Sequence, residues 1–115
     1  MALTSELRRT VRTRLERDRT FRAALLTEAL NACLDGDTAT GKALLRDLVN
    51  ATLGFEGLAR ATGIPAKSLH RMLAPRGNPS SETFFEIVGA LQKSERVRLS
   101  VSVKPARGAK RRSAA

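Results

Sequence analysis

A tight turn between two short amphipathic segments is the strongest restriction on how this chain can fold. Gly63 separates the two segments, and glycine readily adopts the left-handed backbone that such a turn requires. Ile64 follows directly and is expected to pack beneath the turn as an apolar plug. We therefore predict two helices, over residues 55–62 and 65–73, that are joined at a sharp angle.

The second of these segments has two chemically different faces. Pro65 suits its first turn, where the missing N–H removes no hydrogen bond. At about 100° per residue, one face is apolar and holds Leu69, Met72 and Leu73. The opposite face holds Ala66, Lys67, His70 and Arg71. A helix that is anchored on one side and cationic on the other is suited to the major groove of DNA.

The rest of the chain reads as helices followed by one strand. Apolar residues at helical spacing predict further helices over residues 4–16, 21–34, 37–53 and 80–92. Val97, Leu99, Val101 and Val103 then alternate with polar residues, which is the pattern of a half-buried β-strand. One strand alone is not stable, so we expect these four side chains to pair with a second copy in a homodimer.

This pattern predicts a mainly α fold with one C-terminal β-strand and four parts. We expect residues 1–36 to form an N-terminal helical extension and residues 37–92 to form a helix-turn-helix domain. Residues 93–103 would contain the dimerisation strand, and residues 104–115 a disordered basic tail. The helices over 4–34 either dock a partner protein or complete the core.

The charge of the chain indicates an anionic partner. Lys and Arg number 21 against 11 Asp and Glu, which gives a net charge of +10. Such an excess suits nucleic acid, an acidic protein or a membrane surface. The only aromatic residues are four Phe, so a stacking platform for single strands is not expected.

Several functional classes are not expected from this composition. One Cys and one His cannot form a disulfide framework or a Cys/His zinc site. We find no paired carboxylates, nucleophile with a base, or phosphate loop at a credible spacing, so we expect no enzyme and no cofactor. We find no membrane span and no signal peptide, and we expect a cytoplasmic protein.

Residues 54–79 also resemble a known family. Leu58-Ala59, Gly63-Ile64 and Leu69 resemble the helix-turn-helix of the Cro/phage-repressor (XRE) superfamily. The longer stretch GIPAKSLHRMLAPRGNP is similar to the HigA-like addiction-module antidote proteins, and the likeness extends over about residues 1–103. It implies a DNA-binding repressor of its own operon that is the antitoxin of a RelE/HigB-like toxin. Pro65 stands where many repressors have a Ser or Thr cap.

The resemblance places the base-edge readers at Ala66, Lys67 and Arg71, with His70 beside them. Physically, Arg71 can fork onto guanine, Lys67 can reach guanine or a phosphate, and Ala66 can touch a thymine methyl group. Candidates for phosphate contacts are Arg60, Ser68, Arg76, Ser80 and Ser81.

Alternatives remain open for the function. Lys67 and Arg71 could form only a solvated face, and the protein could be a stand-alone regulator without a toxin. A protein-binding adaptor should expose an apolar or acidic groove instead of these cations. An RNA-binding protein should place stacking aromatic residues beside them.

Overall fold

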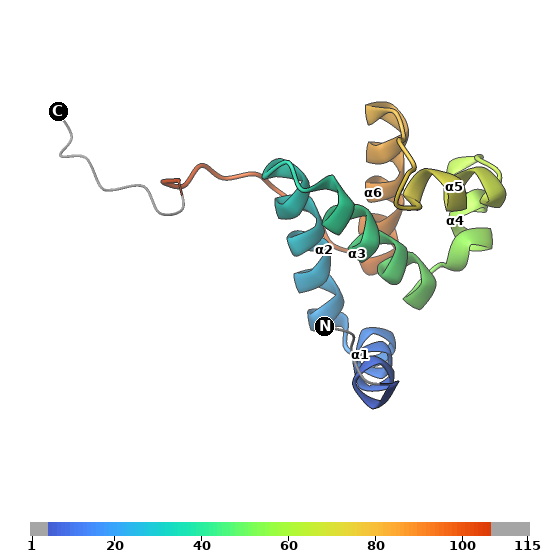
Figure 1. Ribbon diagram of the computed structural model, residues 1–115, viewed down its shortest axis with the longest axis horizontal. Coiled ribbons are helices and arrows are strands. Elements are labelled where there is room, and N and C mark those ends of the chain that lie inside the picture. The colour runs from blue at the N-terminus through green and yellow to red at the C-terminus, as the bar shows by residue number, and fades with distance from the viewer. Residues whose placement is uncertain (1–4, 107–115) are drawn as a thin grey trace, which may run out of the picture.

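The computed structural model describes residues 5–106, in which the chain forms six α-helices (Figure 1). They are α1 (Ser5–Arg17), α2 (Arg19–Leu34), α3 (Thr38–Ala51), α4 (Gly54–Thr62), α5 (Ala66–Leu73) and α6 (Ser81–Glu95). Each expected helix is confirmed, with ends that differ by up to three residues. None of the helices in this range is long and apolar enough to cross a membrane.

Side-chain caps start three of the helices. The side chains of Asp18, Asp37 and Ser80 accept the backbone N–H of the residue three positions further on, at 3.0, 3.2 and 3.1 Å. Each cap satisfies one of the N–H groups that a helix leaves unpaired at its start. Gly63 ends α4 with φ 78°, which is the left-handed turn expected from the sequence.

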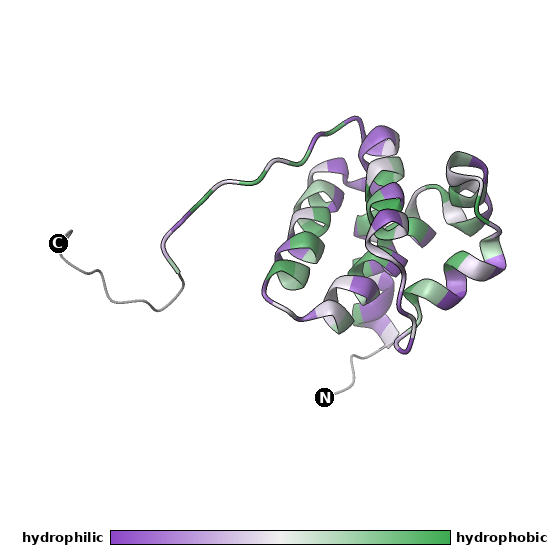
Figure 2. Cartoon of the chain, turned by 90° about the horizontal axis from the view of Figure 1, so that it is seen from above, coloured by the Kyte–Doolittle hydropathy of each residue, from purple (hydrophilic) through white to green (hydrophobic). Residues whose placement is uncertain are grey.

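The core lies around α3, which packs along α2 and also contacts α1, α4 and α5. Figure 2 shows hydrophobic residues along the sides of the helices that face one another. The largest fully buried side chains are Leu26, Leu45, Leu48, Leu58, Leu69, Leu73, Ile87, Leu91 and Val49. Each buried side chain of this size contributes about 1.5–3 kcal/mol to folding. Leu26 belongs to α2, so α2 completes the core.

A half-buried arginine joins the N-terminal helices to the end of α6. The Arg22 Nε donates to the Glu95 Oε1 at 2.7 Å, and the two side chains are only 13% and 7% exposed. The Arg22 Nη1 also donates to the carbonyl oxygens of Leu15 and Glu16, at 3.0 and 3.1 Å. Those carbonyls lie in the last turn of α1. α1 itself projects from the N-terminal end of α2, away from α4 and α5 (Figure 1).

The prediction of a C-terminal strand over residues 97–103 is wrong for the single chain. Residues 5–106 contain no strand. A strand requires a hydrogen-bonded neighbour, and within one copy the backbone N–H groups of Val97 and Leu99 bond instead to Gln92, at 3.0 and 2.7 Å. Val97 and Leu99 are half-buried against the core of their own chain. The extended segment then leaves the helical body (Figure 2), with Val101 84% and Val103 98% exposed.

Most of the basic tail expected over residues 104–115 lies outside the residues that the structure describes. Residues 104–106 continue the exposed extended segment, and residues 107–115 lie outside the described residues. The disorder expected for the tail therefore stays a prediction.

Candidate nucleic-acid interface

α5 is fixed to the core by its apolar face. Leu69 and Leu73 are fully buried, and Met72 and Ala66 pack against the same core at its edge. The helix begins after Pro65, whose φ of −57° and ψ of 140° end the turn that Gly63 starts. α4 and α5 lie side by side at the end of the molecule opposite the C-terminal segment (Figure 1).

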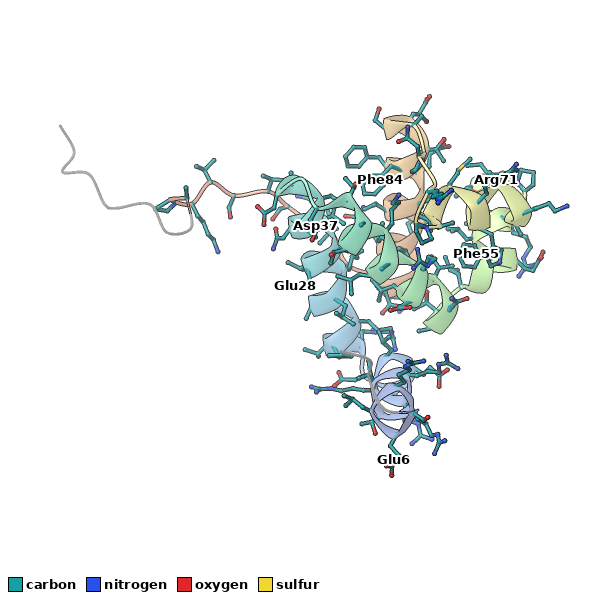
Figure 3. The ribbon with its side chains drawn as sticks, viewed as in Figure 1. Glu6, Glu28, Asp37, Phe55, Arg71 and Phe84 are labelled. Atoms are coloured by element: carbon teal, nitrogen blue, oxygen red, sulfur yellow. The ribbon has the colours of Figure 1, made fainter. Side chains whose placement is uncertain are left out.

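The other face of α5 carries the residues that the sequence assigned to base edges. Lys67, His70 and Arg71 are exposed, and Ala66 is half-buried at the start of the helix. Figure 3 labels Arg71 on α5, at the end of the molecule opposite the C-terminal segment. Within the described residues Lys67 and Arg71 form no ion pair, so both side chains are available to a ligand.

His70 has a structural contact that the sequence did not reveal. Its imidazole stacks on the ring of Phe55 from α4, with the ring centroids 3.8 Å apart and the planes inclined by 20°. Phe55 is only 6% exposed, so the imidazole covers the phenyl ring. One face of the His70 ring is thereby occupied, and His70 also helps to hold α5 against α4.

Two cations of α3 bind the last residue of α5 and the loop that follows it, and sequence analysis missed both of them. The Lys42 Nζ donates to the carbonyl oxygens of Pro75 and Gly77, at 3.1 and 2.6 Å. The Arg46 Nη1 donates to the carbonyl oxygen of Leu73, the last residue of α5. Arg46 thus satisfies an unpaired carbonyl of α5, and positive charge at this end of a helix complements the negative end of its dipole.

Lys42 is only 9% exposed, so its ammonium group depends on these acceptors. A signal for this role is present in the sequence. Lys42 and Arg46 are four residues apart and fall, by helical spacing, on the same face as Leu45 and Val49. Two cations on an apolar face indicate that their charged ends have partners inside the fold.

Gly77 allows the loop between α5 and α6 to lie directly on the last turn of α5. A Cβ atom at this position would stand 2.2 Å from the carbonyl oxygens of Arg71 and of Met72. The Gly77 N–H donates to the carbonyl oxygen of Ala74 at 2.8 Å. The loop is thus held from one side by Lys42 and closed from the other by this contact.

The candidate phosphate ligands are distributed around α5. Arg60 on α4 and Arg76 in the loop are exposed, and Ser68 is half-buried on α5 itself. The Ser80 hydroxyl is already engaged, since it accepts from the Thr83 N–H and lies 3.1 Å from the Thr83 hydroxyl. Ser81 is exposed in the first turn of α6.

Comparisons of the chain with protein-family models, with curated proteins and with solved structures found no match. The resemblance to the XRE and HigA-like proteins therefore stays a prediction from sequence.

The close approach at Gly77 yields a prediction with a matched control. Gly77→Ala forces a methyl group against two backbone carbonyls, and we expect it to lower the free energy of unfolding by about 1–3 kcal/mol. Gly89→Ala in α6 places its methyl group in open space and should raise that free energy by about 0.5–1 kcal/mol. Urea unfolding followed by far-UV circular dichroism measures both values. Equal shifts for the two variants would contradict the close approach.

Proposed function

We propose that this protein is a sequence-specific, double-stranded DNA-binding transcriptional regulator. The observation that carries the proposal is the position of α5. Its apolar side is fully buried at Leu69 and Leu73, its cationic side is exposed, and its last carbonyl is held by Arg46. A short helix that is fixed in this way and bears free cations suits insertion into a major groove.

The side chains on α5 match the chemistry of base edges. The guanidinium of Arg71 can donate two parallel hydrogen bonds to guanine, and the ammonium of Lys67 can reach guanine or a phosphate. The methyl group of Ala66 can contact the methyl group of thymine. Arg60 and Arg76 flank the helix and would bind phosphates, which sets the register on the duplex without reading sequence.

The same surface argues against the other classes of partner. A protein-binding adaptor would need an apolar or acidic groove at α5, where Lys67, His70 and Arg71 are exposed instead. An RNA-binding surface would need an exposed aromatic ring for stacking. Phe55, the one phenyl ring on α4 and α5, is buried beneath His70, and the exposed Phe85 lies on α6 instead.

The resemblance to HigA-like proteins extends the proposal to an antitoxin and autorepressor of a toxin–antitoxin operon. In that case α1 would offer a RelE/HigB-like toxin a surface outside the helix-turn-helix. A stand-alone regulator without a toxin would use α5 in the same way. DNA binding is therefore the part of the proposal that α5 supports.

We also propose that two copies pair through the C-terminal segment. Val101 and Val103 are exposed in the stretch of residues 100–106, which follows the hydrogen bonds of Val97 and Leu99 to Gln92 and forms none of its own within residues 5–106. Antiparallel pairing with a second copy would satisfy that backbone and bury both valines. It would also give two copies of α5 a two-fold relation, which suits a palindromic operator.

Val101→Pro tests the dimer. Proline removes a backbone donor from the paired segment, so the dimer expected for the wild type should become a monomer. Ala106→Pro, beyond the two exposed valines, is the control and should remain dimeric. Light scattering at micromolar concentration distinguishes the outcomes. A monomeric wild type, or a dimer that Val101→Pro leaves intact, would rule out this interface.

Arg71→Ala tests the reading of bases. We expect it to weaken binding to a duplex selected from a random library by about 1–3 kcal/mol and to relax discrimination at one base pair. Arg60→Ala is the matched control, because loss of a phosphate contact should weaken binding to all sequences alike. Titrations on selected and scrambled duplexes at fixed salt measure both effects. Equal affinity for the two duplexes that Arg71→Ala leaves unchanged would refute the proposal.

A further inference from the structure

A second cationic surface lies between α1 and the start of α2, away from α5. It is a shallow hollow of about 710 Å³ whose lining residues are arginines, threonines and Asp18. We call it the arginine hollow and define it by Arg9, Thr13, Arg17, Arg19 and Thr20. These five residues are exposed. Helical spacing places Arg9, Thr13 and Arg17 on one side of α1.

The three arginines that define the arginine hollow have no ion-pair partner among the described residues, and the acidic residue in its lining, Asp18, is already paired with Arg14. Arg9, Arg17 and Arg19 form no ion pair within residues 5–106. The Asp18 carboxylate accepts the Phe21 N–H, which lowers its pKa, and the Arg14 Nε lies 3.4 Å from it. Arg14 in turn lies over the Phe21 ring, 4.5 Å from its centroid. Three arginines are therefore left without a counter-charge.

This chemistry favours the phosphodiester backbone over an acidic protein. Arginine guanidinium and threonine hydroxyl groups are common donors to phosphate oxygens. A protein interface would instead need a buried apolar or aromatic anchor at its centre, and the lining of the hollow supplies none. Open shape and unpaired positive charge suit a ligand that presents a row of anions.

We infer that the arginine hollow binds the phosphate backbone of duplex DNA as a contact separate from α5. The inference rests on the proposed function in that it takes the same ligand. The hollow lies on α1, which projects away from α4 and α5 (Figure 1), and none of its lining residues belongs to α5, so the two surfaces would contact different phosphates. The contact adds affinity and salt dependence and reads no sequence.

The test compares two double variants of the full chain that remove the same charge from the same helix. Arg9→Gln with Arg17→Gln removes two of the three unpaired arginines of the arginine hollow. Arg8→Gln with Arg12→Gln is the control, because these exposed arginines do not line the hollow. Arg12 instead lies near Asp47 of α3, where it opposes the rise in the pKa of that carboxyl caused by burial. Far-UV circular dichroism checks that both variants are folded.

The readout is the dependence of affinity on salt for a scrambled duplex. Each lost phosphate contact should reduce the slope of log K against log salt by about 0.9, so the hollow variant should lose about 1.8 and the control almost nothing. An unchanged slope, or an equal change in both variants, overturns the inference. A hollow variant that keeps its slope but no longer binds polyglutamate would assign the hollow to an acidic protein.

The same titrations separate this inference from the proposed function. If the hollow variant keeps the wild-type slope while Arg71→Ala loses discrimination, the inference fails and the proposed function stands. If the slope falls while Arg71→Ala has no effect, the hollow binds DNA and the role proposed for α5 fails. A wild-type protein that binds no duplex refutes both.

Discussion

The hydrogen bonds from α3 to the end of α5 determine how the cationic face is presented. Lys42 and Arg46 together bind three carbonyl oxygens, in the last residue of α5 and in the loop that follows it. A nearly buried ammonium group is costly unless its acceptors are in place, so helix and loop must adopt this arrangement for Lys42 to be satisfied. Leu69 and Leu73 anchor the opposite side, which leaves α5 little freedom to rotate.

The same principle operates at the other end of the molecule. Arg22 joins the end of α1 to Glu95 in the last turn of α6. Breaking a buried pair of this kind is costly because the remaining charge stays buried, so the pair fixes where α1 leaves the core. Arginines and lysines therefore have two roles in this chain. Lys42 is buried and Arg22 and Arg46 are half-buried, and these three position helices, whereas the many exposed cations carry the excess positive charge.

Periodicity predicted the helices because each has one apolar face and a clear end, as at Asp37, Gly63 and Ser80. The prediction of a strand over residues 97–103 failed because alternation shows only that side chains point to two sides. A strand also needs a hydrogen-bonded neighbouring strand, which one copy lacks. The hydrogen bonds of Lys42 and the stacking of His70 on Phe55 depend on residues that are distant in sequence, so helical spacing within one segment could not predict them. The exposed face of α5 followed directly from helical spacing.

We propose that Lys42 holds α5 in the orientation in which Arg71 would read a base pair. A double-mutant cycle with Lys42→Met and Arg71→Ala tests it, with the ratio of affinities for selected and scrambled duplexes as the readout. We expect Lys42→Met to lower this ratio in the wild-type chain and to have little further effect once Arg71 is replaced, which is a coupling of about 0.5–3 kcal/mol. Additive effects, or a ratio that a folded Lys42→Met variant leaves unchanged, would contradict it.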